Sequence, residues 1–224
     1  GVINEQTRIL QFASLSFSIS LWGSFMAWLG GGTLFQVVDE EGLPEEPLFR
    51  LLKEEQINTV TWPVSLLSTF PEIDLPDLQT VISSAEPCTD AVVEKWSRNG
   101  RRFMNMYGNS EVSIGSTVYE YREEGQVLTI GRAMPNTQMY LLDKNLQQVP
   151  IGVTAEVFTG GAGLARGYLN RPEATAEKFI PNPFVDVPGE RLYRTGDLGR
   201  YLPNGEIEFF GRDDFQVSIR GFRI

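Results

Sequence analysis

The stretch LQTVISSAEPCTDAVVEKWSRNGRRFMNMY, residues 78–107, decides the fold because it places a helix-like segment between two strand-like segments. Its first six and last six residues are typical of buried strands. Thr89-Asp90 favours the start of a helix, and Asn99-Gly100 ends it. Two strands joined in this way predict a right-handed crossover in a parallel sheet. Ligands of such sheets bind beyond the carboxyl ends of the strands, which points to residues 83–86 and 105–111.

The residues before this stretch repeat the alternation of helix and strand. Residues 21–29 carry apolar side chains on most sides, which predicts a buried helix. Residues 33–38 and 58–62 are typical of strands, and residues 48–55 have the apolar spacing of a helix. This half of the chain is therefore predicted to be an α/β structure with a largely parallel sheet.

From about Gly131 onward, glycine and proline divide the chain into short runs. Two polar sequences, residues 143–145 and 203–205, are typical of hairpin turns. One helix is expected to start at Arg171-Pro172-Glu173 and to run to Phe179, because proline favours the first helical turn. We therefore predict that a mostly antiparallel barrel or sandwich follows the parallel sheet.

The composition is that of an ordinary globular protein, with 42% hydrophobic and 21% charged residues. The net charge of -10 argues against non-specific binding to nucleic acid. One cysteine and no histidine exclude an internal disulfide, a cysteine-built zinc site and Ser-His or Cys-His nucleophiles. The apolar stretch at residues 19–29 is too short for a bilayer, and no signal peptide precedes it. We expect a cytoplasmic chain that binds neither nucleic acid nor membrane.

Five short segments form a set whose order and spacing carry more information than any one of them. The segments are FASLSF (residues 12–17), NMYGNSE (105–111), GGAGLARGY (160–168), YRTGDL (193–198) and GRDD continuing to RG (211–221). Agreement in order, spacing and residue type over about two hundred residues is very improbable by chance. The set resembles the adenylation domains of nonribosomal peptide synthetases, which belong to the acyl-adenylate-forming enzymes.

The resemblance implies the incomplete core of an adenylate-forming enzyme. A flavodoxin-like parallel-sheet subdomain is expected at residues 1–128, and a smaller, distorted β-barrel subdomain at residues 129–213. Residues 214–224 would form the hinge and the start of a C-terminal subdomain, with Asp214 as the hinge residue. Both ends look cut within folded sequence, so we interpret the chain as a fragment that is inactive or weakly active alone.

The segment at residues 105–111 is implied to bind adenine and phosphate. Tyr107 would stack on adenine, a contact worth roughly 1–3 kcal/mol, and Asn105 would bond the amino edge of the base. Ser110 would reach the α-phosphate, and Glu111 would bind Mg²⁺; these two are the candidate catalytic residues. Asn109 and Ser110 stand where the family usually has proline and threonine, and the serine keeps the hydroxyl. The alternative is a plain turn that joins a strand to a helix.

Asp197 is the residue implied to hold the ribose. A carboxylate can accept two hydrogen bonds from a cis-diol, and the resemblance adds Arg212 as its helper. Ala85 would lie on the strand that faces adenine. For Asp197 the alternative is a Thr-Gly-Asp hairpin turn, and Glu86 can equally be an acid that caps a helix.

The acyl pocket is assigned by matching the segments one by one. The assigned residues are Phe17, Ser18, Ile19, Trp22, Thr61, Ile82, Ser84, Met106, Ile114 and Gly115. Domains that activate α-amino acids nearly always have aspartate at the position of Ser18, where it pairs with the substrate ammonium. A buried ammonium without a counter-ion would cost several kcal/mol, by the order of magnitude for buried charges. We therefore expect an apolar α-keto, α-hydroxy or other acid that lacks the α-ammonium.

The implied partners are ATP or AMP with Mg²⁺, a small carboxylic acid, a carrier protein with its phosphopantetheine thiol, and neighbouring synthetase domains. Three alternatives stay open. The chain could belong to an acyl-CoA ligase or luciferase-type relative, to a domain that activates an α-amino acid, or to a non-catalytic module that kept the fold.

Overall fold

The computed structural model describes residues 3–37, 45–122, 125–213, 218–219 and 222–223. The chain divides into two compact units. The first comprises Gly1–Asn105, Glu120–Gln126 and Ile219–Phe222, and the second comprises Met106–Tyr119, Val127–Ser218 and Arg223–Ile224. The chain therefore passes from one unit to the other within the strand that ends at Tyr107. The subdomain boundaries expected at residues 128 and 213 stay a prediction.

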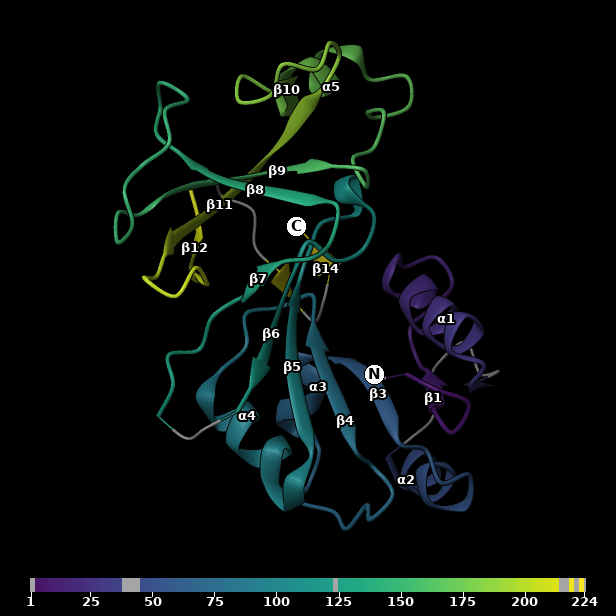
Figure 1. Cartoon of the computed structure of the whole chain (residues 1–224). Coiled ribbons are helices and arrows are strands. Elements are labelled where there is room, and N and C mark those ends of the chain that lie inside the picture. Colours follow the sequence, from purple (N-terminus) through teal and green to yellow (C-terminus); the bar gives the residue numbers. More distant parts are fainter. Residues whose placement is uncertain (1–2, 38–44, 123–124, 214–217, 220–221, 224) are drawn as a thin grey trace. The chain divides into compact units, whose positions relative to one another are not determined.

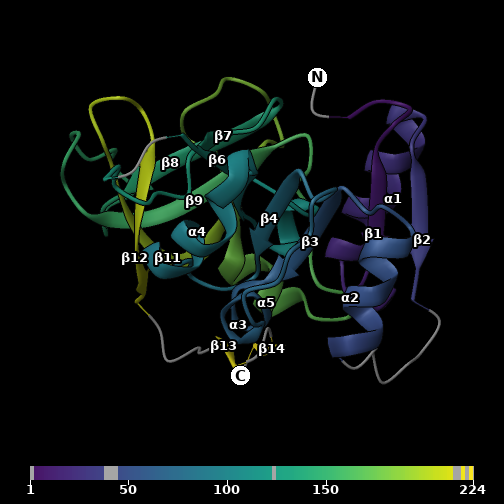
Figure 2. The same cartoon turned by 90° about the horizontal axis from the view of Figure 1, so that it is seen from below.

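The first unit is built on five parallel strands. Their bounds are β1 Arg8–Gln11, β2 Thr33–Gln36, β3 Thr59–Pro63, β4 Thr80–Ser84 and β5 Arg102–Tyr107. The strands lie side by side in the order β2-β1-β3-β4-β5, with β1, β3, β4 and β5 labelled in Figure 1 and β2 in Figure 2. This is the strand order of flavodoxin-like sheets, so the predicted parallel-sheet fold is confirmed.

Helices connect these strands, as the alternating sequence pattern predicts. They are α1 Ile19–Gly30, α2 Glu45–Glu54, α3 Val64–Thr69 and α4 Asp90–Ser97, followed by the short 3-10 turn η1 Arg98–Gly100. Helix α1 lies beside β1 and β2 (Figure 1 and Figure 2). Among the described residues, no helix combines the length and the apolar composition that crossing a membrane requires.

Helix α1 is buried on one face only. Met26 and Ala27 are buried, whereas Leu21, Phe25 and Trp28 are 48%, 49% and 65% exposed. The prediction of a helix buried on most sides is therefore wrong for the second face. The reason is physical: an apolar pattern records which side chains would gain from burial, but not whether a neighbour is present to cover them.

Trp62 on β3 is the centre of an aromatic core in the first unit. It is 0% exposed, and its ring meets those of Phe12, Phe70 and Trp96 edge-on at centroid distances of 6.4, 5.1 and 5.9 Å. The indole N–H of Trp96 donates to the Leu67 carbonyl at 2.9 Å and ties α4 to α3. The Trp62 indole nitrogen has no hydrogen-bond partner among the described residues. Trp62 therefore stabilises the unit through packing.

Trp62→Ala is expected to lower the free energy of unfolding by about 4 kcal/mol, because it leaves a large cavity in a core that cannot collapse fully. Trp62→Phe should cost clearly less, since it keeps a ring and removes the unpaired N–H. Urea denaturation measures both. Trp28→Ala is the matched control and should change stability by less than about 0.5 kcal/mol. Equal losses for Trp62→Ala and Trp28→Ala would contradict the assignment of the core.

The second unit contains an antiparallel sheet. This sheet is made of β8 Thr137–Leu142, β9 Ala155–Gly161, β10 Phe179–Pro181, β11 Arg191–Tyr201 and β12 Ile207–Arg212. The short helices η2 Ser110–Val112 and α5 Pro172–Lys178 accompany it, whereas β6 Thr117–Tyr121 and β7 Arg132–Ala133 continue the other sheet beyond β5. The strand order is β10-β11-β9-β8, and β12 pairs with β11. All these pairings are antiparallel, which confirms the predicted smaller antiparallel subdomain. Two further short strands, β13 Ser218–Ile219 and β14 Phe222–Arg223, pair with each other.

The predicted turns of the second unit are present. Asp143 Oδ1 accepts bonds from the N–H groups of Asn145 and Gln147 at 2.8 and 2.9 Å, which fixes the turn after β8. The turn at residues 203–205 joins β11 to β12, where the Gly205 N–H donates to the Leu202 carbonyl at 2.8 Å. Turn chemistry was thus sufficient to predict the antiparallel pattern.

Candidate nucleotide-binding site

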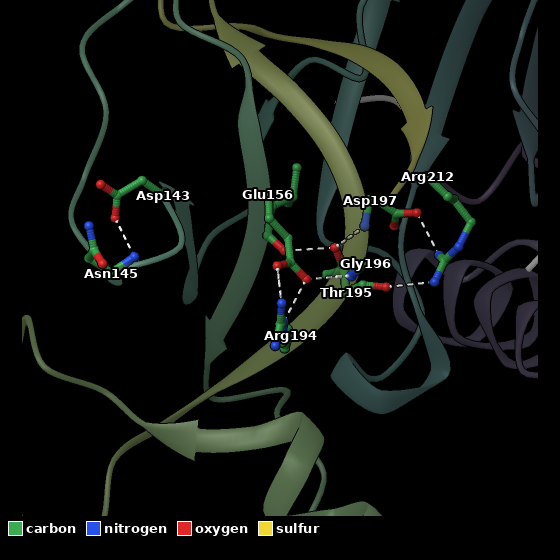
Figure 3. Close-up of polar contacts among 9 residues, drawn as sticks. Asp143, Asn145, Glu156, Arg194, Thr195, Gly196, Asp197 and Arg212 are labelled. Atoms are coloured by element: carbon green, nitrogen blue, oxygen red, sulfur yellow. Dashed lines mark hydrogen bonds and ion pairs between the residues drawn. The ribbon is translucent and has the colours of Figure 1, made fainter. Parts of the chain in front are cut away.

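Asp197 lies on the long strand β11, opposite Arg212 on β12. Arg212 donates from Nη1 to Asp197 Oδ1 at 2.6 Å and from Nη2 to the Thr195 carbonyl at 2.9 Å (Figure 3). The Tyr107 hydroxyl donates to Asp197 Oδ2 at 2.5 Å. Tyr107 and Arg212 therefore both bind the Asp197 carboxylate, and all three residues were predicted from separate segments to bind nucleotide.

The charge of this carboxylate is balanced inside the unit. The Asp197 side chain is 5% exposed, and an unpaired buried charge would be strongly unfavourable. A carboxylate has about four acceptor positions. Asp197 can therefore keep its bonds to Arg212 and Tyr107 and still accept hydrogen bonds from a cis-diol, which suits a ribose.

Tyr107 is held by the loop that follows it. The Ser116 N–H donates to the Tyr107 carbonyl at 2.8 Å, so residues 108–116 fold back onto the end of β5. The Tyr107 ring lies near Phe209, with centroids 6.2 Å apart and planes tilted by 44°. The stacking of Tyr107 on adenine stays a prediction.

Glu111 lies on η2 and is oriented by the glycine-rich segment at residues 160–168. The Tyr168 hydroxyl donates to Glu111 Oε1 at 2.8 Å, and the Ala165 N–H donates to the Glu111 carbonyl at 2.8 Å. Ser113 Oγ donates to the Gly163 carbonyl at 3.0 Å. No chemistry for this segment could be predicted from residue types alone. Its role is visible only in three dimensions, because residues 111 and 168 are 57 positions apart.

Tyr193 packs beneath this turn. It forms a buried cluster with Val112 and Phe179, and Tyr168 packs against the cluster. Burial raises the pKa of the Tyr193 phenol, and the negative charge of Glu111 raises it further. Tyr193 therefore stays neutral throughout the physiological range and acts as a packing residue beside the acid.

Ser110, predicted to reach the α-phosphate, lies on η2 in the second unit, whereas two further predicted nucleotide-binding residues lie in the first unit. Asn105 is buried, and its Oδ1 accepts a bond from Ser83 Oγ at 3.1 Å. Ala85 follows β4 with a backbone φ of 68°. Next to it, Glu86 Oε2 accepts the Ser65 N–H at 2.6 Å at the start of α3. Glu86 therefore caps the N-terminus of α3, which favours its interpretation as a helix-capping acid over a role in ligand binding.

The predicted pocket residues are divided between the units. Phe17, Ser18, Ile19, Trp22, Thr61, Ile82 and Ser84 belong to the first unit, and Met106, Ile114 and Gly115 to the second. Thr61 pairs with Ile82 across β3 and β4, and a side chain at Gly115 would meet Met106 Sδ at 3.0 Å. Their assignment to an acyl pocket stays a prediction. The hinge residue Asp214 lies outside the residues that the structure describes.

A family model described as AMP-binding enzyme matches residues 1–169 of the chain. The chain belongs to the AMP-binding enzyme family. The predicted resemblance to adenylation domains is confirmed by relatives among the peptide synthetases. The chain is 45% identical over 222 residues to bacitracin synthase 3 of Bacillus licheniformis, covering 99% of this chain and 3% of that protein. It is 41% identical over 226 residues to tyrocidine synthase 1 of Brevibacillus parabrevis, covering 99% of this chain and 20% of that protein.

Solved structures give the same family placement. Holo-PA1221, an NRPS protein with adenylation and PCP domains bound to a vinylsulfonamide inhibitor, matches with a TM-score of 0.90 and 28% identity over 99% of this chain and 40% of that chain. The N-terminal subdomain of Klebsiella oxytoca NpsA, in complex with 3-hydroxyanthranilyl-AMSN, matches with a TM-score of 0.81 and 26% identity over 92% of this chain and 53% of that chain. This AMP-binding chain thus spans at most one fifth of the two synthetases and about half of the NpsA N-terminal subdomain.

The fit of Mg²⁺ depends on Glu111. Within the described part of the chain, no group of three or more His, Cys, Asp or Glu side chains could hold a metal ion. Mg²⁺ bound with nucleotides commonly takes one or two carboxylates and completes its shell with phosphate oxygens and water. A single carboxylate on a short turn beside Ser110 fits that mode, so Glu111 stays the predicted ligand.

Tyr168→Phe removes the hydroxyl that orients Glu111. A charge-assisted bond of this kind is worth about 1–2 kcal/mol, so ATP binding with Mg²⁺ should weaken about five- to thirtyfold. AMP binding without Mg²⁺ should not change. Titrations with and without MgCl₂ measure both.

Tyr201→Phe is the matched control, because its hydroxyl donates to the Met139 carbonyl at 2.9 Å in the same unit. It should leave the Mg²⁺ dependence at the wild-type value. An equal loss for Tyr168→Phe with and without Mg²⁺ would show that Tyr168 has a structural role only.

Proposed function

We propose that this chain is part of an adenylation domain that activates a carboxylic acid with ATP. A carboxylate oxygen of the acid attacks the α-phosphorus, the bond to the departing pyrophosphate breaks, and an acyl-adenylate remains. The acyl group then passes to the thiol of a carrier protein. The observation that supports this best is the Asp197 carboxylate, held by Arg212 and Tyr107 where a ribose could be bound.

The residues of the chain would share the work as follows. Asp197 accepts hydrogen bonds from the ribose hydroxyls, which fixes the α-phosphate relative to the acid. Ser110 donates its hydroxyl to a phosphate oxygen, and Tyr168 keeps Glu111 in place as the Mg²⁺ ligand. When bound, Mg²⁺ offsets the negative charge of the phosphates.

For the acid, we propose a substrate without an α-ammonium. Ser18 stands at the N-cap of α1, where its carbonyl accepts the Leu21 N–H at 3.1 Å. Residues 6–38 contain no aspartate or glutamate, so a small error in matching this segment would not bring a carboxylate into its place. An ammonium bound here would need a counter-ion from another part of the protein. The competing candidate is an α-amino acid, which the peptide-synthetase names of the relatives favour.

Matched acyl-sulfamoyl adenosines test the substrate. Three analogues with the same branched side chain and an α-hydroxyl, α-keto or α-ammonium group are titrated against the chain by ligand-observed NMR. We expect the hydroxy or keto compound to bind at least about 100-fold better than the ammonium compound, because one unpaired buried charge costs about 3 kcal/mol or more. Ser18→Asp should reverse this order. Preference of the wild-type chain for the ammonium compound would overturn the substrate proposal and leave the nucleotide site intact.

The acceptor is proposed to be a carrier protein. One matching solved structure, holo-PA1221, contains adenylation and PCP domains, and another is an artificially fused adenylation–PCP di-domain from Klebsiella oxytoca. The alternative acceptor is coenzyme A. Transfer from a preformed acyl-adenylate, measured with the complete synthetase and either a phosphopantetheinylated carrier or coenzyme A, separates the two.

A further inference from the structure

Strand β11 departs from regular pairing at the nucleotide site. Against β9, Arg194 pairs with Phe158 and Leu198 pairs with Glu156. Three residues of β11, 195–197, therefore stand opposite the single residue Val157. Gly196 in the middle has a backbone φ of 76°, in the left-handed region that favours glycine. Such a bulge redirects side chains, and here it includes Asp197.

Glu156 on β9 bonds directly to this bulge. Its Oε1 accepts the Gly196 N–H at 3.1 Å (Figure 3). Both carboxylate oxygens also accept Arg194 Nε at 3.0 Å, and Oε2 lies 2.9 Å from Arg194 Nη2. One acid therefore holds the middle of the bulge and the residue before it.

The rest of the bulge is held by the Thr195 hydroxyl. Thr195 Oγ1 donates to the Val157 carbonyl at 2.7 Å and accepts the Asp197 N–H at 2.9 Å. Glu156 differs from these partners because it is charged and is only 13% exposed. Its hydrogen bond also raises the pKa of the Arg194 guanidinium, so the arginine stays charged. Truncating Glu156 would leave the Gly196 N–H without this acceptor, and a charged acceptor is the stronger kind.

We propose that Glu156 is a positioning residue for nucleotide binding, which sets the bulge so that the Asp197 carboxylate is presented to a ribose. It does not touch the nucleotide; it acts through Gly196. This inference rests on the proposed function, because it assumes that Asp197 binds ribose. The competing explanation is that the Glu156–Arg194 ion pair only stabilises the sheet and has no effect on nucleotide binding.

The chain offers a matched control for that explanation. Glu208 on β12 pairs with Arg200 on β11, with Arg200 Nε 2.7 Å from Oε2, and Glu208 is 19% exposed. This second Glu–Arg pair lies where Arg200 and Glu208 are direct neighbours in the ladder, beyond the bulge. Glu156→Ala and Glu208→Ala therefore each remove one Glu–Arg pair whose arginine lies on β11, and only Glu156 bonds to the bulge.

The test compares AMP with 2′,3′-dideoxy-AMP on the full chain by ligand-observed NMR. Wild type should prefer AMP at least about 100-fold, since two bonds to a charged group are at stake. Glu156→Ala should reduce this preference to about twofold with little change for the dideoxy compound, and Glu208→Ala should keep it. Glu156→Gln should give an intermediate ratio, because its amide oxygen can still accept the Gly196 N–H. Hydrogen exchange of the Gly196 amide should accelerate at least about tenfold in Glu156→Ala only.

Two results would overturn the inference. The first is that Glu156→Ala prefers AMP over the dideoxy compound as strongly as wild type does, while Asp197→Asn loses this preference. The second is equal loss in Glu156→Ala and Glu208→Ala, which would assign both acids to sheet stability. If wild type itself does not distinguish AMP from the dideoxy compound, the proposed function fails instead. Unchanged Gly196 exchange in Glu156→Ala would then reject the positioning of the bulge as well.

Discussion

Asp197→Ala is expected to weaken AMP binding at least about 100-fold, because it removes the charged acceptor of two hydrogen bonds that the ribose hydroxyls donate, each worth about 1.5–3 kcal/mol. It also removes the carboxylate that pairs with Arg212, whose side chain is 17% exposed. Breaking a largely buried pair on one side costs about 3 kcal/mol of folding stability. Both effects follow from one carboxylate, so binding and urea denaturation must be measured on the same preparation.

A second variant separates the two effects. Asp197→Asn keeps the volume and one acceptor oxygen, so it should fold better and still lose at least about tenfold in affinity. Asp143→Asn is the control, because it changes a carboxylate in an exposed turn of the same unit. It should bind AMP like wild type. Wild-type affinity in a folded Asp197→Asn chain would show that this carboxylate does not bind the ribose.

Gly108→Ala is expected to damage the site through the backbone. A Cβ at this position would lie 2.2 Å from the Ile114 carbonyl oxygen and 2.7 Å from Gly115 Cα. These are backbone atoms, so residues 108–115 must shift, and Tyr107 and Glu111 flank or belong to that loop. We expect a loss of about 2–3 kcal/mol in stability, the range for overpacking, and at least about tenfold weaker AMP binding.

Gly205→Ala provides the comparison for this glycine. Among the residues that the structure describes, none has an atom within 4 Å of the position that an alanine methyl group would take. The φ of Gly205 is 82°, so the left-handed conformation is what penalises the change. The cost should be about 1–2 kcal/mol with unchanged AMP binding. Urea denaturation and ligand-observed NMR on both variants measure the two effects. Equal binding losses for the two would contradict a specific role for the close approach at Gly108.

Much of the fold could be predicted because it depends on local patterns. The alternation of helices and strands, the turns at residues 143–145 and 203–205 and the helix that starts at Pro172 all follow from neighbouring residues. Helix α1 shows the limit. Its existence was predicted correctly, but its exposed face was not, because burial depends on segments far away in the chain.

The candidate site likewise has a part that could be predicted from the sequence and a part that could not. The segments at residues 105–111, 193–198 and 211–221 named Tyr107, Asp197 and Arg212 through resemblance, yet no sequence pattern joins Tyr107 to Asp197 across 90 positions. Glu156 was missed altogether. In the sequence Glu156 is one acid in an ordinary strand pattern. Its proposed role becomes visible only when β9 is placed beside the bulge of β11.

The sequence by itself determined the class of fold and the family, and it named the residues proposed to meet a nucleotide, because residue type and spacing set local conformation and carry the family motifs. The tertiary structure alone decided how these residues act on one another. It brought Tyr107 and Arg212 to one carboxylate, Tyr168 to Glu111, and Glu156 to the Gly196 N–H. The physical reason is that hydrogen bonds extend about 3 Å in space and are indifferent to separation along the chain.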